Sequence, residues 1–260
     1  MHHPQAASRQ SVAQSAAGIL ARLRVRRPRV HCITNSVAQN FTANALLAAG
    51  CLPSMTVSAE EVGSFVSGAQ GLLVNLGTFD KERREAITIA IEASRSNALP
   101  WVLDPVFVDR APTRAAFARE LIAQRPAVIR LNHVEFSTLA GGKPLPGAVA
   151  AYARAGQAVI GLSGESDFVS DGERTVSIAN GHPLMARVTA MGCAGSALVV
   201  ACLAMDPDPF IATVAALLII NIAGELAAEK SAGPGDFAAS IIDALYNLDE
   251  PTLIDRAKVS

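Results

Sequence analysis

The stretch R-V-T-A-M-G-C-A-G-S-A-L-V-V-A-C-L, from Arg187 to Leu203, marks the change from extended chain to helix around which the rest of the sequence is organised. Thr189 to Ser196 is a run of small residues with one methionine, and a strongly apolar helical pattern follows it. Because the first N–H groups of a helix lack intrahelical partners, such a turn predicts an anion-binding site. The stretch alone leaves open that its small residues only permit close packing. Cys193 lies in its middle, where a nucleophile or proton acceptor would face a ligand.

Outward from this stretch, short apolar runs alternate with helical patterns along most of the chain. Strands are expected over residues 30–33, 54–57, 71–77, 101–106, 127–132 and 158–165, with a hairpin over 167–178. Helices are expected over residues 11–27, 40–50, 78–96, 115–124, 136–140, 146–155, 210–229 and 236–247, with a further one starting at 58. Repeated alternation of strand and helix predicts an α/β fold with a mostly parallel central sheet flanked by helices.

The domain organisation follows from length and composition. The chain has 260 residues, of which 50% are hydrophobic and only 5% aromatic, which is ample for one large core. Residues 1–10 are polar and are expected to form a disordered arm, and residues 11–260 are expected to form a single domain, because no linker or repeat interrupts them.

Charge and cysteine content exclude several classes of partner. With 17% charged residues and a net charge of −1, nothing points to nucleic acid or to an anionic membrane surface. The apolar segments 196–203 and 210–227 contain polar residues and are interpreted as buried helices, not membrane spans. The four cysteines form no C-x-x-C pair, which indicates reduced thiols in a cytoplasmic protein.

Polar side chains recur where the predicted strands end, and the carboxyl ends of parallel strands are where open α/β sheets bind ligands. They are Asn35, Asp104, Asn132 with Glu135, the Ser163–Glu165 turn, and Cys193 before the apolar helix. Asp104 and Glu135 are carboxylates that could hold Mg²⁺, which needs only one or two of them besides phosphate oxygens and water. Taken singly, Asp104 could instead cap a helix and Glu135 could be a surface residue.

Arg130 is a cation near the end of an apolar strand. A bound phosphate would explain it, and so would a salt bridge to Asp104 or Glu135. Mg²⁺, an arginine and a helix N-terminus together are typical of phosphoryl transfer. Neither a Walker A motif nor a G-x-G-x-x-G after the first strand is present.

Over about residues 12–250, the sequence resembles the hydroxyethylthiazole kinases, which belong to the ribokinase-like superfamily. The resemblance rests on many motifs in the same order, among them H-C-I-T-N from His31, N-F-T-A-N from Asn40, N-L-G-T from Asn75, L-D-P-V from Leu103, I-R-L-N-H-V-E from Ile129, S-G-E from Ser163 and G-P-G-D-F from Gly233. It implies a ribokinase-like fold and an ATP- and Mg²⁺-dependent kinase that phosphorylates the primary alcohol of 4-methyl-5-(2-hydroxyethyl)thiazole in thiamine biosynthesis or salvage.

The same resemblance implies roles for individual residues. Substrate contacts fall to Met55, Asn35 and Ala190, ATP contacts to Arg130, Ser163, Asn132 and Gly192, the metal to Asp104 and Glu135, and the catalytic position to Cys193. The turn here is T-A-M-G-C where the family has a fuller glycine form, so Met191 adds bulk beside the phosphate path. The resemblance also implies a homotrimer with active sites at the subunit contacts.

Two other functions compete with this one: a kinase of another small alcohol or vitamin precursor on the same fold, and a nucleotide-binding regulator without turnover. The regulator remains a hypothesis because related sugar kinases carry a catalytic aspartate where this chain has Cys193. A thiol is a weak base while it is neutral. We therefore expect Cys193 mainly to position the alcohol, with most of the rate coming from the anion site and Mg²⁺.

Overall fold

The structure is a computed structural model that describes residues 5–6 and 9–260. Its centre is one sheet, which in these residues has nine strands in the order β1-β9-β8-β7-β6-β5-β4-β2-β3. The strands are β1 (Gln5–Ala6), β2 (Arg29–Ile33), β3 (Leu52–Ser54), β4 (Gly71–Asn75), β5 (Trp101–Asp104), β6 (Val128–Asn132), β7 (Val159–Ser163), β8 (Asp167–Ser170) and β9 (Arg174–Ile178). Neighbouring strands from β3 to β7 are parallel, and β8 is antiparallel to β7 and β9. The predicted α/β fold with a mostly parallel sheet is confirmed.

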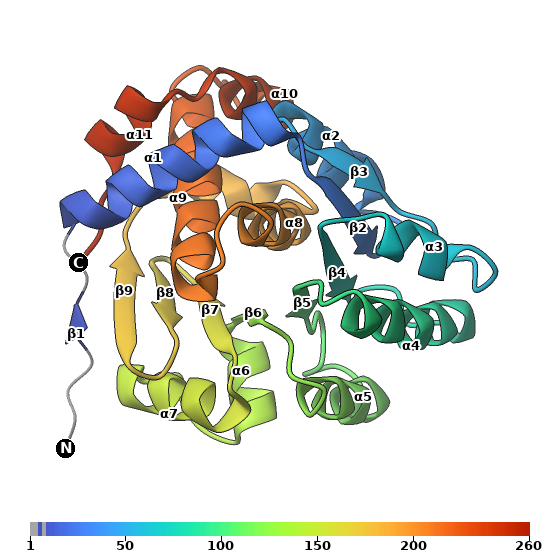
Figure 1. Ribbon diagram of the computed structural model, residues 1–260. Helices are drawn as coiled ribbons and strands as arrows, with labels where there is room; N and C mark the ends of the chain where they lie inside the picture. The colour runs from blue at the N-terminus through green and yellow to red at the C-terminus, as the bar shows by residue number, and fades with distance from the viewer. Residues whose placement is uncertain (1–4, 7–8) are drawn as a thin grey trace.

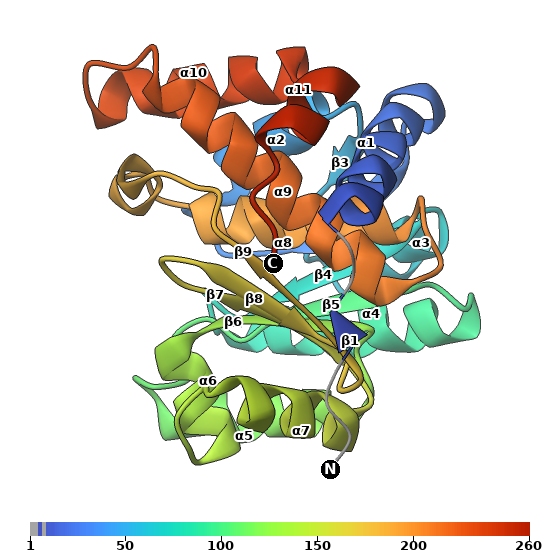
Figure 2. The same ribbon diagram turned by 90° about the vertical axis from the view of Figure 1, so that its left-hand side faces the viewer.

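Helices cover both faces of the sheet (Figures 1 and 2). They are α1 (Arg9–Arg26), α2 (Gln39–Ala48), α3 (Val62–Ser67), α4 (Lys81–Ser96), α5 (Pro112–Ile122), α6 (His133–Ala140), α7 (Pro146–Gly156), the 3₁₀ helix η1 (Pro183–Arg187), α8 (Met191–Leu203), α9 (Pro209–Ala228), α10 (Pro234–Asn247) and α11 (Glu250–Arg256). One core cluster packs α8 and α9 against one face, with α1, α10 and α11 outside them. A second cluster packs α4 to α7 against the other face.

Helix α9 is long and apolar enough to cross a membrane by length and composition alone. Its most apolar window has a mean hydropathy of 2.1, and 83% of that window is buried inside the protein. The helix lies between α1, α8 and α10, which cover it (Figure 1). It is therefore a core helix, as the polar interruptions of its sequence predicted.

Several boundaries differ from the sequence prediction. Helix α8 already begins at Met191, because Ala190 takes a left-handed conformation (φ 76°) that turns the chain directly into the helix. The strand expected over 54–57 instead covers Leu52–Ser54, and its pairing with β2 ends at His31 and Ser54. Helices η1 and α11 were not predicted.

The predicted disordered arm over residues 1–10 is only partly described. Residues 1–4 and 7–8 lie outside the described residues. Gln5 and Ala6 form β1, which pairs with β9, and Arg9 begins α1. Arg9 and Gln10 therefore belong to the helix and not to an arm.

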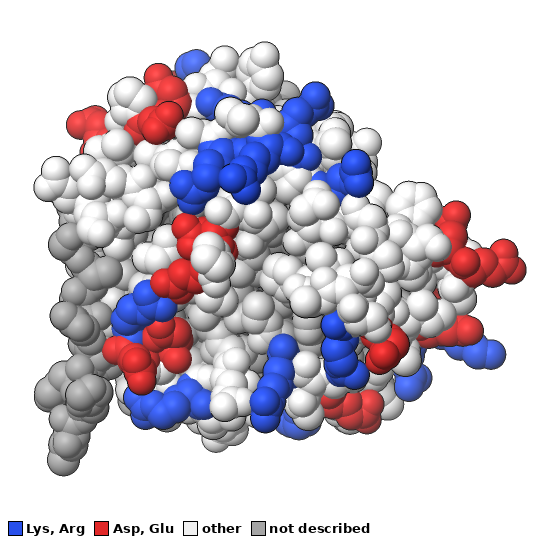
Figure 3. Space-filling model, in the orientation of Figure 1, with Lys and Arg blue, Asp and Glu red and all other residues white. Residues whose placement is uncertain are grey.

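Basic side chains gather over α1 on the face seen in Figure 3. The last turn of α1 carries Arg24 and Arg26, where positive charge favours the negative end of the helix dipole. Arg24 Nη2 also donates to the backbone oxygens of Leu245 (3.3 Å) and Tyr246 (2.9 Å) near the end of α10. Arg24 therefore has a structural role, because these contacts join α1 to α10.

Gly71 sets how closely α8 can approach β4, and its replacement tests this packing. A Cβ at Gly71 would lie 2.6 Å from Cγ1 of the buried, β-branched Val200. Gly71→Ala is expected to lower the free energy of unfolding by about 1–3 kcal/mol in urea denaturation, because a β-branched side chain in a helix has little rotamer freedom. Gly147→Ala is the control, since that position in α7 is exposed and its Cβ would meet nothing within 4 Å. Equal stability of the two variants would contradict the packing argument.

Candidate functional site

The N-terminus of α8 lies over the carboxyl ends of the central strands, and Cys193 is in its first turn. Helix α8 packs across β2, β4 and β5. Cys193 is only 8% exposed. Its Sγ accepts hydrogen bonds from Nδ2 of Asn35, which follows β2, at 3.2 Å and from Nδ2 of Asn75, at the end of β4, at 3.3 Å. Residues far apart in the sequence thus converge on one sulfur atom.

Asp104, the last residue of β5, is a buried carboxylate beside this cluster. Its Oδ2 accepts from Asn75 Nδ2 at 2.7 Å and from the Ser196 hydroxyl at 2.8 Å. Burial raises the pKa of Asp104, whereas the positive charge of Arg130 and the two hydrogen bonds lower it. Asn75 and Ser196 therefore tie β4 and α8 to the carboxylate on β5.

The two asparagine side chains are oriented by backbone groups. Asn35 Oδ1 accepts from the Ala38 N–H at 2.9 Å, and Asn75 Oδ1 accepts from the Gly77 N–H at 2.9 Å. These bonds direct the amide nitrogens toward Cys193. A Cβ at Gly77 would lie 2.7 Å from Cβ and Nδ2 of Asn35, so glycine is required where the two loops meet.

Glu135 lies 5% exposed in the first turn of α6. Its Oε2 accepts from the Asn132 N–H at 2.9 Å in a capping box, and its Oε1 accepts from the Phe107 N–H at 3.2 Å. Burial raises the pKa of Glu135 to about 7, and the neighbouring charge of Asp104 adds to the effect. Glu135 is therefore not a surface residue. Asn132 caps α6, whereas Asp104 ends β5 and caps no helix among the described residues.

Both carboxylates are buried, and the charge of Asp104 raises the pKa of Glu135, so a divalent cation bound between them would stabilise their ionised forms. In the described residues no group of three His, Cys, Asp or Glu side chains could hold a metal. The donor set of Asp104 and Glu135 is all oxygen and incomplete. It suits Mg²⁺, which keeps several waters and takes further oxygens from substrate phosphates.

Arg130, in the middle of β6, reaches the first turn of α8. Its Nη1 donates to the Gly192 carbonyl at 2.9 Å, and a Cβ at Gly195 would lie 3.3 Å from its Cζ. Among the residues that the structure describes, Arg130 forms no salt bridge to Asp104 or Glu135, so that explanation of its position is wrong. Its Nε is buried and has no hydrogen-bond partner in the described part of the chain. The guanidinium keeps donor capacity that a phosphate would satisfy.

The start of α8 has the geometry of an anion site. Ala190, the N-cap residue, is left-handed and provides no side-chain cap. Backbone hydrogen bonding begins with the Ala194 N–H, which donates to the Ala190 oxygen at 2.9 Å, so the preceding N–H groups of α8 have no partner among the described residues and could bind an anion. The Met191 side chain is 8% exposed and belongs to the hydrophobic core. The expected bulk beside the phosphate path is therefore directed into the protein.

The structure places the remaining predicted residues as follows. Ser163 is the register partner of Asn132 at the adjoining ends of β7 and β6, and its hydroxyl donates to the Leu131 oxygen at 3.3 Å. Met55 is half-buried directly after β3 and packs on the core cluster that includes α2 and α8. No hydrogen bond links Ser163 or Met55 to the Cys193 cluster within the described part of the chain.

Sequence reasoning did not identify Asn75 and Ser196 as site residues. Asn75 is wholly buried at the carboxyl end of β4, so the rule that singled out Asn35 and Asp104 would also have found it. Ser196 is four residues after Gly192, whose oxygen it also contacts at 3.2 Å. A hydroxyl inside an apolar helical run was the only signal, and it is a weak one.

The raised pKa of Glu135 predicts a pH-dependent stability. Between pH 4.5, its ordinary pKa, and about 7, the folded protein keeps a proton that the unfolded chain releases, so stability falls as pH rises through this window. The Glu135→Gln variant should not lose stability in this way, because glutamine does not ionise. In metal-free buffer its free energy of unfolding, relative to the unchanged protein, should rise by roughly 2–3 kcal/mol from pH 5 to pH 8. Glu60→Gln, at an exposed glutamate, is the control. A difference that does not vary with pH would contradict the burial argument.

Comparisons with known proteins bear on the family of this chain. The profile of the hydroxyethylthiazole kinase family matches residues 20–251. A probable hydroxyethylthiazole kinase from Agrobacterium fabrum is 43% identical over 247 residues, which are 95% of each chain. The structure of a hydroxyethylthiazole kinase from Pyrococcus horikoshii OT3 has a TM-score of 0.90 and 36% identity, with 94% of this chain and 98% of that one covered.

A more distant likeness bears on the fold alone. A ribokinase-like superfamily protein from Enterococcus faecalis V583 has a TM-score of 0.68 at 12% identity, with 95% of this chain and 97% of that one covered. The central sheet and its two helical layers are thus the ribokinase-like fold. With the family profile, the close relatives and the strand-end cluster around Cys193 in agreement, the chain belongs to the hydroxyethylthiazole kinase family.

Proposed function

We propose that this chain transfers the γ-phosphoryl group of ATP to the primary alcohol of 4-methyl-5-(2-hydroxyethyl)thiazole. The observation that carries the proposal is the N-terminus of α8, which contacts Arg130 and, through Ser196, the buried carboxylate of Asp104, whose charge in turn acts on Glu135. Such a constellation serves phosphoryl transfer by positioning and charge neutralisation. The curated relatives named as kinases of this alcohol support the choice of substrate.

In this proposal the alcohol lies between Asn35 and Met55, with its hydroxyl beside Cys193. Met55 offers a polarisable apolar wall to the thiazole ring, and the Asn35 amide is already directed to the place of the hydroxyl. The free N–H groups that follow Ala190 would bind the negative charge that develops on the transferred group. They are fixed in the helix before substrate arrives, so no reorganisation is needed at the moment of transfer.

ATP phosphates would be bound along the adjoining strand ends by Arg130, Asn132, Ser163 and Gly192. The unpartnered Nε of Arg130 supports its assignment. Asp104 and Glu135 would hold Mg²⁺, directly or through water, and the ion would supply charge neutralisation at the phosphate oxygens. Its binding would also offset the burial and the neighbouring charge of Asp104, which together raise the pKa of Glu135.

Cys193 has the position of a proton acceptor, but its thiol is not deprotonated at neutral pH. Burial raises the pKa of its thiol to about 11, and the charge of Asp104 adds to this, so the sulfur stays protonated at neutral pH. A neutral thiol is a weak base. We therefore assign to Cys193 the orientation of the alcohol, with only weak assistance to proton removal.

We further propose a cytoplasmic homotrimer with active sites at the subunit contacts. The proposal is supported by the outer edge of β3, directly before Met55, where Leu52 is 38% exposed, and by Phe65 of α3, which lines the same groove and is 44% exposed. Unpaired strand edges with apolar neighbours favour contact with another chain. The four cysteines are free thiols, which fits a reducing compartment.

The function is tested by ADP release from ATP and Mg²⁺ in the presence of the thiazole alcohol, hydroxymethylpyrimidine or a panel of sugars. We expect turnover with the thiazole alcohol alone. Turnover with another alcohol would keep the site and replace the substrate. ATP binding without ADP release on any alcohol would overturn the proposal in favour of a nucleotide-binding regulator.

The role of Cys193 is tested by Cys193→Ala. We expect kcat to fall by no more than about tenfold, since a general base contributes about 10²- to 10⁴-fold and this thiol is a poor one. Steady-state kinetics in both substrates measures the effect, and Cys202→Ala, a buried thiol in the same helix, is the control for packing. Complete loss of turnover with ATP binding intact would show that Cys193 is an essential base.

A further inference from the structure

His31 is a wholly buried side chain of β2 that the proposed reaction leaves without a role. Its Nδ1 lies 2.8 Å from the Ser54 hydroxyl, and its Nε2 lies 3.1 Å from the Thr56 backbone oxygen. These two partners flank Met55 in the sequence. One ring therefore holds the chain on both sides of the residue that is assigned to the substrate.

The two contacts define the tautomer of the ring. A carbonyl oxygen only accepts hydrogen bonds, so Nε2 carries the proton that is donated to Thr56. Burial lowers the pKa of His31 to about 4, so the ring is neutral near pH 7 and Nδ1 accepts from the Ser54 hydroxyl. Both hydrogen bonds are thus satisfied at once, without a charge in the core.

The geometry of β3 explains what these bonds accomplish. His31 and Ser54 are register partners, so their side chains lie on the same face of the sheet. Side chains alternate between faces in extended chain, and Met55 packs on the opposite core cluster, which contains α2 and α8. With the Ser54 side chain on one face and the Thr56 backbone oxygen bonded to the same ring, Met55 is directed to the opposite face, on which α8 and Cys193 lie.

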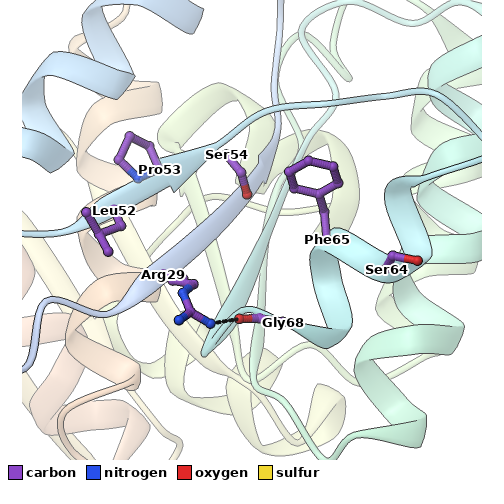
Figure 4. A pocket seen from close by; sticks show the side chains of 7 residues that line it. All are labelled: Arg29, Leu52, Pro53, Ser54, Ser64, Phe65 and Gly68. Carbon is purple, nitrogen blue, oxygen red and sulfur yellow. Dashed lines mark hydrogen bonds between the residues drawn. The ribbon is translucent and has the colours of Figure 1, made fainter.

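Strand pairing supports this segment on one side only. β3 has three residues and pairs only with β2 in the described chain, and a groove of about 430 Å³ separates it from α3. Figure 4 shows Ser54 and Phe65 at one end of this groove and the bonded pair Arg29 and Gly68 at the other. Residues 55–57 lie outside the sheet, where the Thr56 hydroxyl donates to Glu61 and accepts from the Ser58 N–H at 3.4 Å, and Val57 packs on the core cluster of α4 to α7.

We propose that His31 is a positioning residue for the alcohol substrate, which it serves by holding the Ser54–Thr56 segment so that Met55 forms one wall of the thiazole site. The inference rests on the proposed function, since it takes Met55 as a substrate contact. It adds a residue that touches neither substrate but determines how tightly the alcohol binds. ATP binding, on the strands around Arg130, is independent of this segment.

The test compares His31→Gln, His31→Leu and Ser54→Ala by steady-state kinetics in both substrates. We expect His31→Leu, which loses both hydrogen bonds, to raise KM for the alcohol by about tenfold or more, because a lost buried hydrogen bond costs roughly that factor. His31→Gln can still donate to Thr56 and should recover part of the loss. Ser54→Ala should raise the same KM by a few-fold. KM for ATP should stay unchanged, and kcat should change less than KM for the alcohol.

Ser64→Ala is the matched control, because Ser64 lines the same groove but makes no bond to His31. A purely structural role would lower the amount of active protein without a selective change in KM for the alcohol, and this result would overturn the inference. If His31→Leu does not fold, the inference is tested with Ser54→Ala and His31→Gln, again by whether KM for the alcohol rises while KM for ATP does not. Absence of turnover in the protein without substitutions would instead refute the proposed function. Failure of the proposed function is therefore distinguishable from failure of the inference about His31.

Discussion

The buried carboxylate of Asp104 is the constraint on which the rest of the site depends. A carboxylate in the core is tolerated only with hydrogen-bond donors and positive charge around it. Asn75 on β4 and Ser196 on α8 supply the donors, and Arg130 supplies the charge. Because Asn75 also donates to Cys193, the contacts that satisfy the carboxylate fix the sulfur and the start of α8 as well.

The small residues at the start of α8 serve both purposes that the sequence left open. Gly192 and Gly195 allow the Arg130 guanidinium to lie directly against the first turn, which is close packing. The uncapped turn after Ala190 leaves N–H groups free, which is an anion site. Close packing and anion binding occur together here, because an arginine that packs against a helix N-terminus adds its own positive charge to that of the backbone donors.

Much of the site could be predicted because the carboxyl ends of parallel strands meet at one edge of the sheet. Asn35, Asp104 and Asn132 were identified by this rule alone, and Asn75 follows the same rule. Ser196 could not be identified, since only the crossing of α8 over β5 brings it to the carboxylate. The start of α8 at Met191 depends on one left-handed residue, which an alanine does not reveal in sequence.

The sequence by itself determined the alternation of strands and helices, the burial of α9 and the family, since hydrophobic periodicity and ordered motifs are properties of the chain. Only the tertiary structure decided which polar groups meet. His31 is an unremarkable core residue of a strand in the sequence, and its hold on Ser54 and Thr56 appears only when β2 and β3 pair. Likewise the raised pKa of Glu135 comes from burial and from Asp104, both products of folding. Contacts between distant residues depend on packing, which local sequence does not encode.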